Sequence, residues 1–199
     1  MPKETFYHLN VEKREKIEKA IQNELGRTSF EKASVSRIIK EAHIPRGSFY
    51  QYFEDKEDAI QYIIKNYLQL EKVTIKRILI ETKGNLFETA IKIFDYMTTE
   101  MMEKGKINLY NNIIQELKKN NISLFLLLNK KEEREQIDKL IDQSILNINE
   151  KEDLIYILKI LSIITRTAIA NVTTGKMQKE QAMKELIIQI KILKRGMEK

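Results

Sequence analysis

A short run near residue 50 carries polar groups that can pair with the edges of DNA bases: Arg46, Gly47, Ser48 and Gln51. The Arg46 guanidinium can bind guanine or a phosphate, and the Gln51 amide can pair with adenine. Gly47 and Ser48 are small, so they would let the backbone approach a nucleic acid closely. The run is therefore a candidate DNA-reading surface.

Such a surface needs a helix to carry it, and the sequence predicts one from Pro45 to Phe53. Phe49 and Phe53 stand four residues apart, so they share one apolar face of that helix. Proline suits the first turn of a helix, and we expect this helix to begin at Pro45. Tyr50 and Tyr52 could join the aromatic core or present their hydroxyls to polar partners.

A second short helix is predicted directly before this one, with Ser34 at its N-cap. Its apolar stripe consists of Val35, Ile38, Ile39 and Ala42. His43 falls at the corner between the two helices, where a left-handed backbone conformation is often needed, and His is enriched there. We interpret His43 as a corner residue rather than a ligand or base. Two short helices joined by a tight corner are typical of a helix-turn-helix.

The run from Ser34 to Ile60 resembles the DNA-binding signature of TetR-family transcription regulators. The matching elements are Ser34-Val35, the run Gly47 to Phe53, and Asp55-Lys56-Glu57. The chain departs from the family pattern at His43, where the family usually has Gly, and at Pro45, where it has Ser or Thr. Neither departure removes a group that reads bases.

Carried over position by position, the resemblance implies two sets of DNA contacts. The implied base readers are Arg46, Gly47, Ser48 and Gln51. The implied phosphate contacts are Ser36, Arg37, Tyr50, Tyr52 and Lys56. For Lys56 a solvated surface lysine is the alternative.

Composition places the chain among soluble globular proteins, with 199 residues, 42% of them hydrophobic and 32% charged. The net charge of +6 permits nucleic-acid binding, but residues 1–56 hold 11 Lys and Arg against 9 Asp and Glu, so charge supports that function only weakly.

The absence of cysteine excludes disulfides, thiolate zinc sites and thiol redox sensing. No signal-peptide core is present at the N-terminus, and Leu154 to Ile164 is interrupted by Lys159 and too short to span a bilayer, which predicts a cytoplasmic protein.

Apolar residues recur with a period near 3.6, and Gly and Pro are few, so we predict an all-α fold of about nine helices. A first helix from Val11 to about Gly26 should cover the two short ones, with Phe30 filling the loop between, to give a helix-turn-helix DNA-binding domain over residues 1–56. Residues 57–199 should form a helical effector-binding and dimerisation domain. Its expected helices are Asp55 to about Leu79, Leu86 to Lys104, Ile107 to Lys119, Glu132 to Ile148, Glu152 to Thr174 and Gln178 to Arg195, with a helical turn or two over Ile122 to Leu128.

The helix from Glu152 to Thr174 is apolar on two faces, which one small monomer struggles to cover. We expect this helix and the last one to form a four-helix interface in a two-fold homodimer, as the family does. The predicted interface residues are Leu154, Leu158, Leu161, Met183, Leu186, Ile187 and Ile190. A two-fold dimer would bind double-stranded DNA at a palindromic operator with half-sites about one turn apart.

The resemblance also implies a mostly apolar pocket for a small apolar or amphipathic effector. Its candidate lining consists of Tyr62, Tyr67, Phe94, Met97, Met101, Tyr110, Ile114, Phe125, Tyr156 and Arg166. Met and Tyr at helical spacing are more often core residues than pocket residues. Thr165 and Arg166 could orient a ligand or bond across the dimer, and the sequence leaves both open.

An enzyme built on a helical bundle is the competing class of function. Thr5 and Lys40 stand three residues before the two histidines, so the Glu-x-x-His pairs of a di-metal bundle are missing. There is no phosphate-binding glycine loop, no nucleophile elbow and no His-Glu-x-x-His, so we expect no enzyme, cofactor or metal. A regulator that ignores ligands, or answers to a protein partner, stays open as an alternative.

Overall fold

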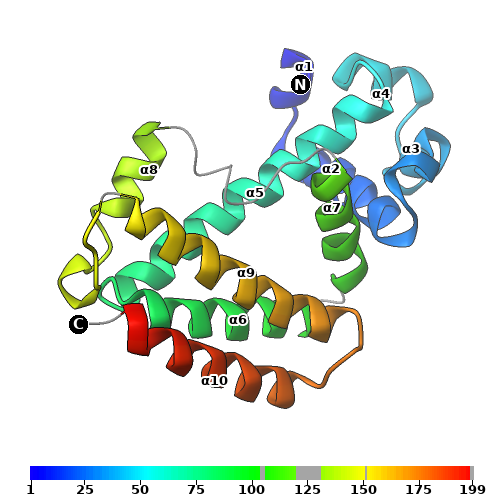
Figure 1. Ribbon diagram of the computed structural model, residues 1–199. Coiled ribbons are helices and arrows are strands. Elements are labelled where there is room, and N and C mark those ends of the chain that lie inside the picture. The colour runs from blue at the N-terminus through cyan, green and yellow to red at the C-terminus, as the bar shows by residue number, and fades with distance from the viewer. Residues whose placement is uncertain (104–105, 120–130, 151, 198–199) are drawn as a thin grey trace. The chain divides into compact units, whose positions relative to one another are not determined.

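The computed structural model describes residues 1–103, 106–119, 131–150 and 152–197. In these residues the chain forms ten α-helices and divides into two compact units (Figure 1). The first unit contains Met1–Leu70 and Lys106–Asn121, and the second contains Glu71–Gly105 and Ile122–Lys199. The all-α prediction is confirmed, with one more helix than expected. The units do not follow the single boundary after residue 56 that the sequence suggested.

The first unit is built around a helix-turn-helix. Its elements are α1 (Glu4–Tyr7), α2 (Val11–Arg27), a 3-10 turn (Phe30–Lys32), α3 (Val35–Glu41), α4 (Arg46–Tyr52), the start of α5 (Lys56–Glu81) and α7 (Ile107–Lys119). Of these α-helices, only α1 was not predicted. The fully buried side chains include Phe6, Ile17, Ile21, Leu25, Ile38, Phe49 and Phe53. The expected core placement of Phe49 and Phe53 is therefore confirmed.

The corner between α3 and α4 has the predicted left-handed residue at His43, with φ of 53°. The His43 amide donates to the Lys40 carbonyl at 3.4 Å, and the Ile44 amide donates to the Ile39 carbonyl at 3.1 Å. This pair of bonds caps the C-terminus of α3. Pro45 is the N-cap of α4 rather than its first residue. Ser34 occupies the N-cap of α3, but its side chain makes no capping bond.

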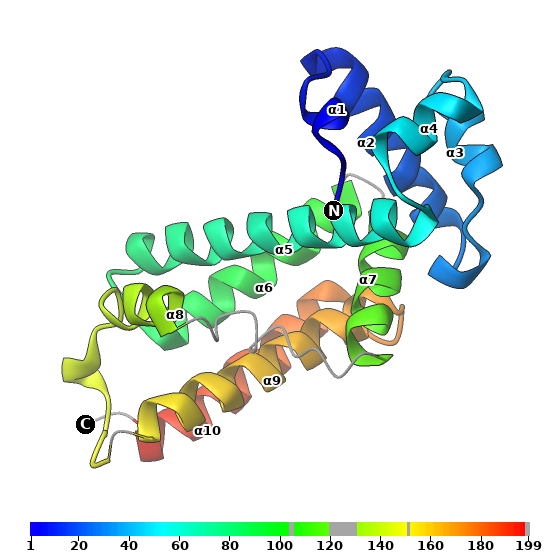
Figure 2. The ribbon, with the colours of Figure 1, turned by 90° about the horizontal axis from the view of Figure 1, so that it is seen from above.

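The second unit contains the end of α5, α6 (Leu86–Glu103), α8 (Lys131–Asp138), a 3-10 turn (Gln143–Ile145), α9 (Asp153–Thr173) and α10 (Lys179–Met197). Helices α6, α9 and α10 pack side by side (Figures 1 and 2). Their shared core includes Phe87, Phe94, Leu161, Leu186 and Ile190. The predicted segment Ile122 to Leu128 lies outside the described residues.

The helix predicted from Glu132 to Ile148 was partly wrong, because α8 ends at Asp138. Two hydrogen bonds favour a turn at Asp142: its amide donates to the distant Gly84 carbonyl at 3.1 Å, and its carboxylate accepts from the Ser144 amide at 3.0 Å. Gly84 has φ of +81°, and a side chain there would collide with the backbone of Leu140 and Asp142. This glycine is therefore required where α5 turns into α6.

Helix α9 has 21 residues and is long and apolar enough to cross a membrane by length and composition alone. The helix extends well beyond Leu154 to Ile164, the stretch that is by itself too short to span a bilayer. One side of α9 packs on α6 and α10, which accounts for part of its apolar character. Its outward side carries Tyr156, Ile160 and Ile163, all exposed.

Candidate nucleic-acid interface

Helix α4 turns its aromatic face inward and its polar face outward. Phe49 is fully buried, whereas Arg46, Gly47 and Gln51 are exposed and Ser48 is half-buried. The Arg46 guanidinium lies 5.8 Å from the centre of the Tyr50 ring and donates to the Tyr50 hydroxyl at 3.4 Å. The four predicted base readers therefore lie on one short helix, and Tyr50 supports the arginine from one turn away.

Gly47 lies at an open position on this surface. A Cβ added to it would meet no atom of the protein within 4 Å. Packing within the chain therefore does not require glycine here. A requirement for glycine at this position would have to come from something that approaches α4 from outside.

Two of the predicted phosphate contacts have partners inside the protein. Tyr52 is only 5% exposed and packs against Phe6, with ring centres 6.1 Å apart. The Lys56 ammonium donates to the Glu31 carbonyl at 3.0 Å. Tyr52 is therefore a core residue, and the structure contradicts its predicted role as a phosphate contact. The Lys56 bond connects the start of α5 to the 3-10 turn before α3. Ser36 is exposed, as a phosphate contact needs.

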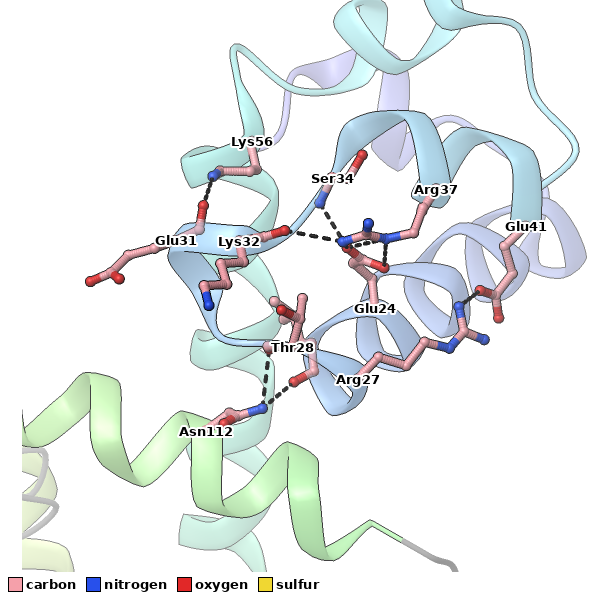
Figure 3. A network of polar contacts seen from close by, with 11 residues as sticks. Glu24, Arg27, Thr28, Glu31, Lys32, Ser34, Arg37, Glu41, Lys56 and Asn112 are labelled. Carbon is pink, nitrogen blue, oxygen red and sulfur yellow. Dashed lines mark hydrogen bonds and ion pairs between the residues drawn. The ribbon is translucent and has the colours of Figure 1, made fainter.

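Arg37, a third predicted phosphate contact, belongs to a polar network around the buried Glu24 carboxylate (Figure 3). The Glu24 carboxylate is 0% exposed and accepts from Arg37 Nε at 2.8 Å and Nη2 at 2.6 Å. It also accepts from the Ser34 amide at 2.7 Å, while Arg37 Nη2 donates to the Lys32 carbonyl at 3.0 Å. The network fixes the N-terminus of α3 onto α2. The Arg37 side chain is 54% exposed, so its ion pair with Glu24 leaves part of the guanidinium at the surface.

The charges of this network stabilise each other. Hydrogen bonding from Arg37 lowers the pKa of Glu24 from its ordinary value of 4.5, and Glu24 in turn raises the pKa of Arg37. Sequence reasoning missed Glu24, although a signal was present. The residue continues the apolar spacing Ile17, Ala20 and Ile21, so it is a carboxylate at a core position of α2.

Further polar contacts hold the C-terminal end of α2. The Glu41 carboxylate accepts from Asn23 at 2.5 Å and from Arg27 at 2.6 Å. Asn112 of α7 donates to the backbone carbonyls of Leu25 at 2.7 Å and Thr28 at 3.1 Å (Figure 3). Helix α7 thus satisfies carbonyls that the end of a helix leaves open.

The predicted pocket residues divide between the two units. Phe94, Met97 and Met101 are buried on α6 in the second unit, where Arg166 is half-buried on α9. The first unit contains Tyr62, Tyr67, Tyr110 and Ile114. Tyr156 is exposed, and Phe125 lies outside the described residues.

The surroundings of four of these residues show whether they could line a pocket. Tyr62 packs in an aromatic cluster with Phe6 and donates to Glu18 at 2.6 Å, so it is a core residue of the first unit. The rings of Tyr67 and Tyr110 lie 6.3 Å apart. Tyr156 is too exposed for an enclosed pocket.

The second unit contains a half-buried acid, Glu71, that sequence reasoning did not single out. Burial raises the pKa of Glu71 to about 7, and the positive charge of Arg166 partly opposes that rise. Thr165 donates to the Leu161 carbonyl of its own helix at 2.7 Å. In the described part of the chain, no group of three or more His, Asp or Glu side chains could hold a metal ion.

The predicted dimer residues face mostly inward. Leu154, Leu161, Leu186 and Ile190 are buried, and Leu158, Met183 and Ile187 are half-buried. The structure contradicts an interface role for the four buried residues, because they fill the core between α6, α9 and α10. The large apolar side chains that stay exposed on α9 and α10 are Tyr156, Ile160, Ile163, Ile188 and Ile192, here called the outer apolar stripe.

Two family models match the chain. One, described as bacterial regulatory proteins of the tetR family, matches residues 18–63. The other, described as a tetracyclin repressor-like C-terminal domain, matches residues 85–197. A curated relative, the uncharacterized HTH-type transcriptional regulator YdgC of Bacillus subtilis, is 30% identical over 83 residues, which are 42% of this chain and 43% of the relative. The matched region thus spans less than half of that relative.

Several solved structures share the fold. A putative TetR-family transcriptional regulator from Mesorhizobium loti has a TM-score of 0.63 at 9% identity, covering 94% of this chain and 98% of that one. Another from Syntrophomonas wolfei has a TM-score of 0.62 at 21% identity, covering 94% and 97%. The fatty acid degradation regulator FadR from Bacillus halodurans has a TM-score of 0.55 at 16% identity, covering 92% and 96%.

Proposed function

Because this chain belongs to the TetR family of helix-turn-helix transcription regulators, we propose that it is a homodimeric repressor that binds a palindromic operator. The family is not one of enzymes, and DNA binding is the task of its helix-turn-helix. The observation that carries the proposal is the outward polar face of α4, with Arg46, Ser48 and Gln51 on a helix whose other face is core. We expect a cytoplasmic protein without a membrane partner.

In this proposal α4 enters the major groove and presents base-reading side chains. Arg46 is the donor for guanine or a phosphate, and Gln51 is the amide for adenine. Gly47 leaves the open space that close approach of DNA needs. Phosphate contacts would come from exposed groups such as Ser36, Arg37 and Tyr50, since Tyr52 is buried within the protein.

We expect Gln51→Ala to relax the choice of base at one or two positions of each half-site. The loss should be about 1–3 kcal/mol per half-site on the operator, with little change on random DNA, because an amide without charge adds nothing to phosphate attraction. Fluorescence anisotropy at two salt concentrations would measure it, on a duplex that the unmodified protein selects from a random pool. Gln61→Ala is the matched control, since Gln61 is exposed on α5. Equal loss on both DNAs would contradict a reading role for Gln51.

The second unit would supply the dimer contact through the outer apolar stripe. Tyr156, Ile160 and Ile163 stand four and then three residues apart on α9, so they lie on one line along the helix. Ile188 and Ile192 form a similar line on α10. Two helices with outward apolar lines could bury them against their copies in a four-helix interface.

The effector would bind in the apolar interior of the second unit. Phe94, Met97 and Met101 provide apolar surface on α6, and Glu71 with Arg166 would orient a polar end of the ligand. A small apolar or amphipathic molecule that binds the DNA-free state better would shift the population away from the operator. Thermal shifts with a panel of such molecules would test this, and a panel without effect would favour the ligand-independent regulator.

A further inference from the structure

The end of the proposed reading helix needs partners that the helix itself does not supply. Helix α4 has only seven residues, and the last four carbonyls of any α-helix have no partner within it. The Phe49 carbonyl accepts from the Phe53 amide at 2.9 Å, just past the helix. The carbonyls of Tyr50, Gln51 and Tyr52 must be satisfied from elsewhere.

The first residues of the chain supply all three partners. The Lys3 ammonium donates to the Tyr50 carbonyl at 3.0 Å, and the Thr5 hydroxyl donates to the Gln51 carbonyl at 2.5 Å. The Lys3 amide donates to the Tyr52 carbonyl at 2.8 Å. Residues 1–9, here called the N-terminal arm, thus cap the end of α4 through both side chain and backbone.

The arm is itself held in place by packing and charge. Phe6 is fully buried, with its ring centre 4.9 Å from that of Phe53 and 5.2 Å from that of Tyr62. The Met1 amine pairs with Asp58, and the Lys3 ammonium lies 3.2 Å from the Glu54 carboxylate. These contacts reach the loop after α4 and the first turn of α5, so the arm bridges both sides of that corner.

We propose that the N-terminal arm sets the position of the base-reading residues, with Thr5 and Lys3 as positioning residues for Gln51. This inference rests on the proposed DNA-binding function. The carbonyl that Thr5 binds belongs to Gln51, whose side chain is the proposed adenine contact, so a loose last turn of α4 would move that amide. The arm lies before residue 18, where the match to the DNA-binding family model begins.

The test removes one hydroxyl without changing charge or shape. Thr5→Val deletes the bond to the Gln51 carbonyl, whereas Thr5→Ser keeps a hydroxyl at that place. The matched control is Thr174→Val, because the Thr174 hydroxyl donates to the Ala170 carbonyl at 2.6 Å near the end of α9, in the second unit. Lys3 is left unchanged, since its charge could attract phosphates directly.

We expect Thr5→Val to weaken binding to the selected operator duplex about three- to tenfold, the range of one net hydrogen bond. Binding to random DNA should not change, and amide hydrogen exchange in α4 should become faster by a similar factor. Thr5→Ser and Thr174→Val should behave like the unmodified protein in both measurements.

Three results would overturn the inference. The first is unchanged operator binding and unchanged exchange in Thr5→Val. The second is an equal loss on operator and random DNA, which would make the arm a direct DNA contact. The third is a fall in melting temperature that Thr5→Ser shares, without any change in operator preference. Failure of the unmodified protein to prefer any selected duplex would instead reject the proposed function on which this inference depends.

Discussion

Glu24→Ala is expected to lower the free energy of unfolding by about 3 kcal/mol, equal to a fall of about 6–12 °C in melting temperature. The substitution removes a fully buried carboxylate that accepts from the Ser34 amide and from two nitrogens of Arg37. The Ser34 amide would lose its partner at the N-terminus of α3. Chemical and thermal denaturation followed by circular dichroism would measure the loss.

Glu41→Ala is the matched control for this prediction. Glu41 also accepts two hydrogen bonds, from Asn23 and Arg27, but its side chain is partly exposed. Water can replace those partners, so the expected loss is about 1 kcal/mol or less. Equal losses of unfolding free energy in the two variants would contradict this prediction, because the burial of Glu24 would then add nothing to the strength of its hydrogen bonds.

The pH dependence gives a second readout on Glu24. Its pKa is below 4.5 in the folded protein, so the charged form stabilises the fold above pH 4.5, and that stabilisation is lost as the pH falls through the folded pKa. In Glu24→Gln the side chain cannot titrate. The difference in unfolding free energy between the unmodified protein and Glu24→Gln should therefore shrink below pH 4.5, and a constant difference would contradict the ion pair with Arg37.

The sequence predicted the helix-turn-helix well because its signals are local. His43 and Pro45 mark a corner by their own backbone preferences, and both lie at the corner in the structure. The spacing of Phe49 and Phe53 likewise determines which face of α4 is core. Signals of this kind need no knowledge of the rest of the chain.

The sequence failed where a residue's role depends on a distant partner. Arg37 is a phosphate contact by type, and its spacing does not reveal that it also binds Glu24, thirteen positions earlier. The spacing in α9 predicted two apolar faces correctly, yet periodicity alone does not tell which face meets α6 and α10. The spacing therefore predicts an interface role for Leu154 and Leu161, although they lie in the core. Lys3 and Thr5 carried no motif, and only the fold brings them to α4.

The caps on α4 explain how such a short helix can hold a fixed position. Seven residues make two turns, which are marginal in water without tertiary support. The arm satisfies carbonyls at the C-terminal end of α4, and the Glu24 network fixes the preceding helix α3 onto α2. Precision in the proposed reading surface therefore depends on residues that need not touch DNA.

Ile163→Asp should convert the proposed dimer into a monomer and weaken operator binding about 10²- to 10⁴-fold, because the second half-site would no longer be bound by a linked protomer. Ile163 is 64% exposed and is the last residue of the outer apolar stripe on α9. In a two-fold interface near that position, the two new carboxylates would be buried without partners. Light scattering at micromolar concentration and anisotropy on the selected duplex would measure both effects.

Ile80→Asp is the control for this dimer prediction. Ile80 is the same residue type in the same unit and is 62% exposed, but it lies on α5, outside the stripe. It should leave both the dimer and the operator affinity unchanged. If Ile163→Asp stays dimeric while Ile80→Asp becomes monomeric, the interface uses α5 and the stripe must have another occupant. If the unmodified protein is itself a monomer bound to single half-sites, the two-fold model of operator recognition is wrong.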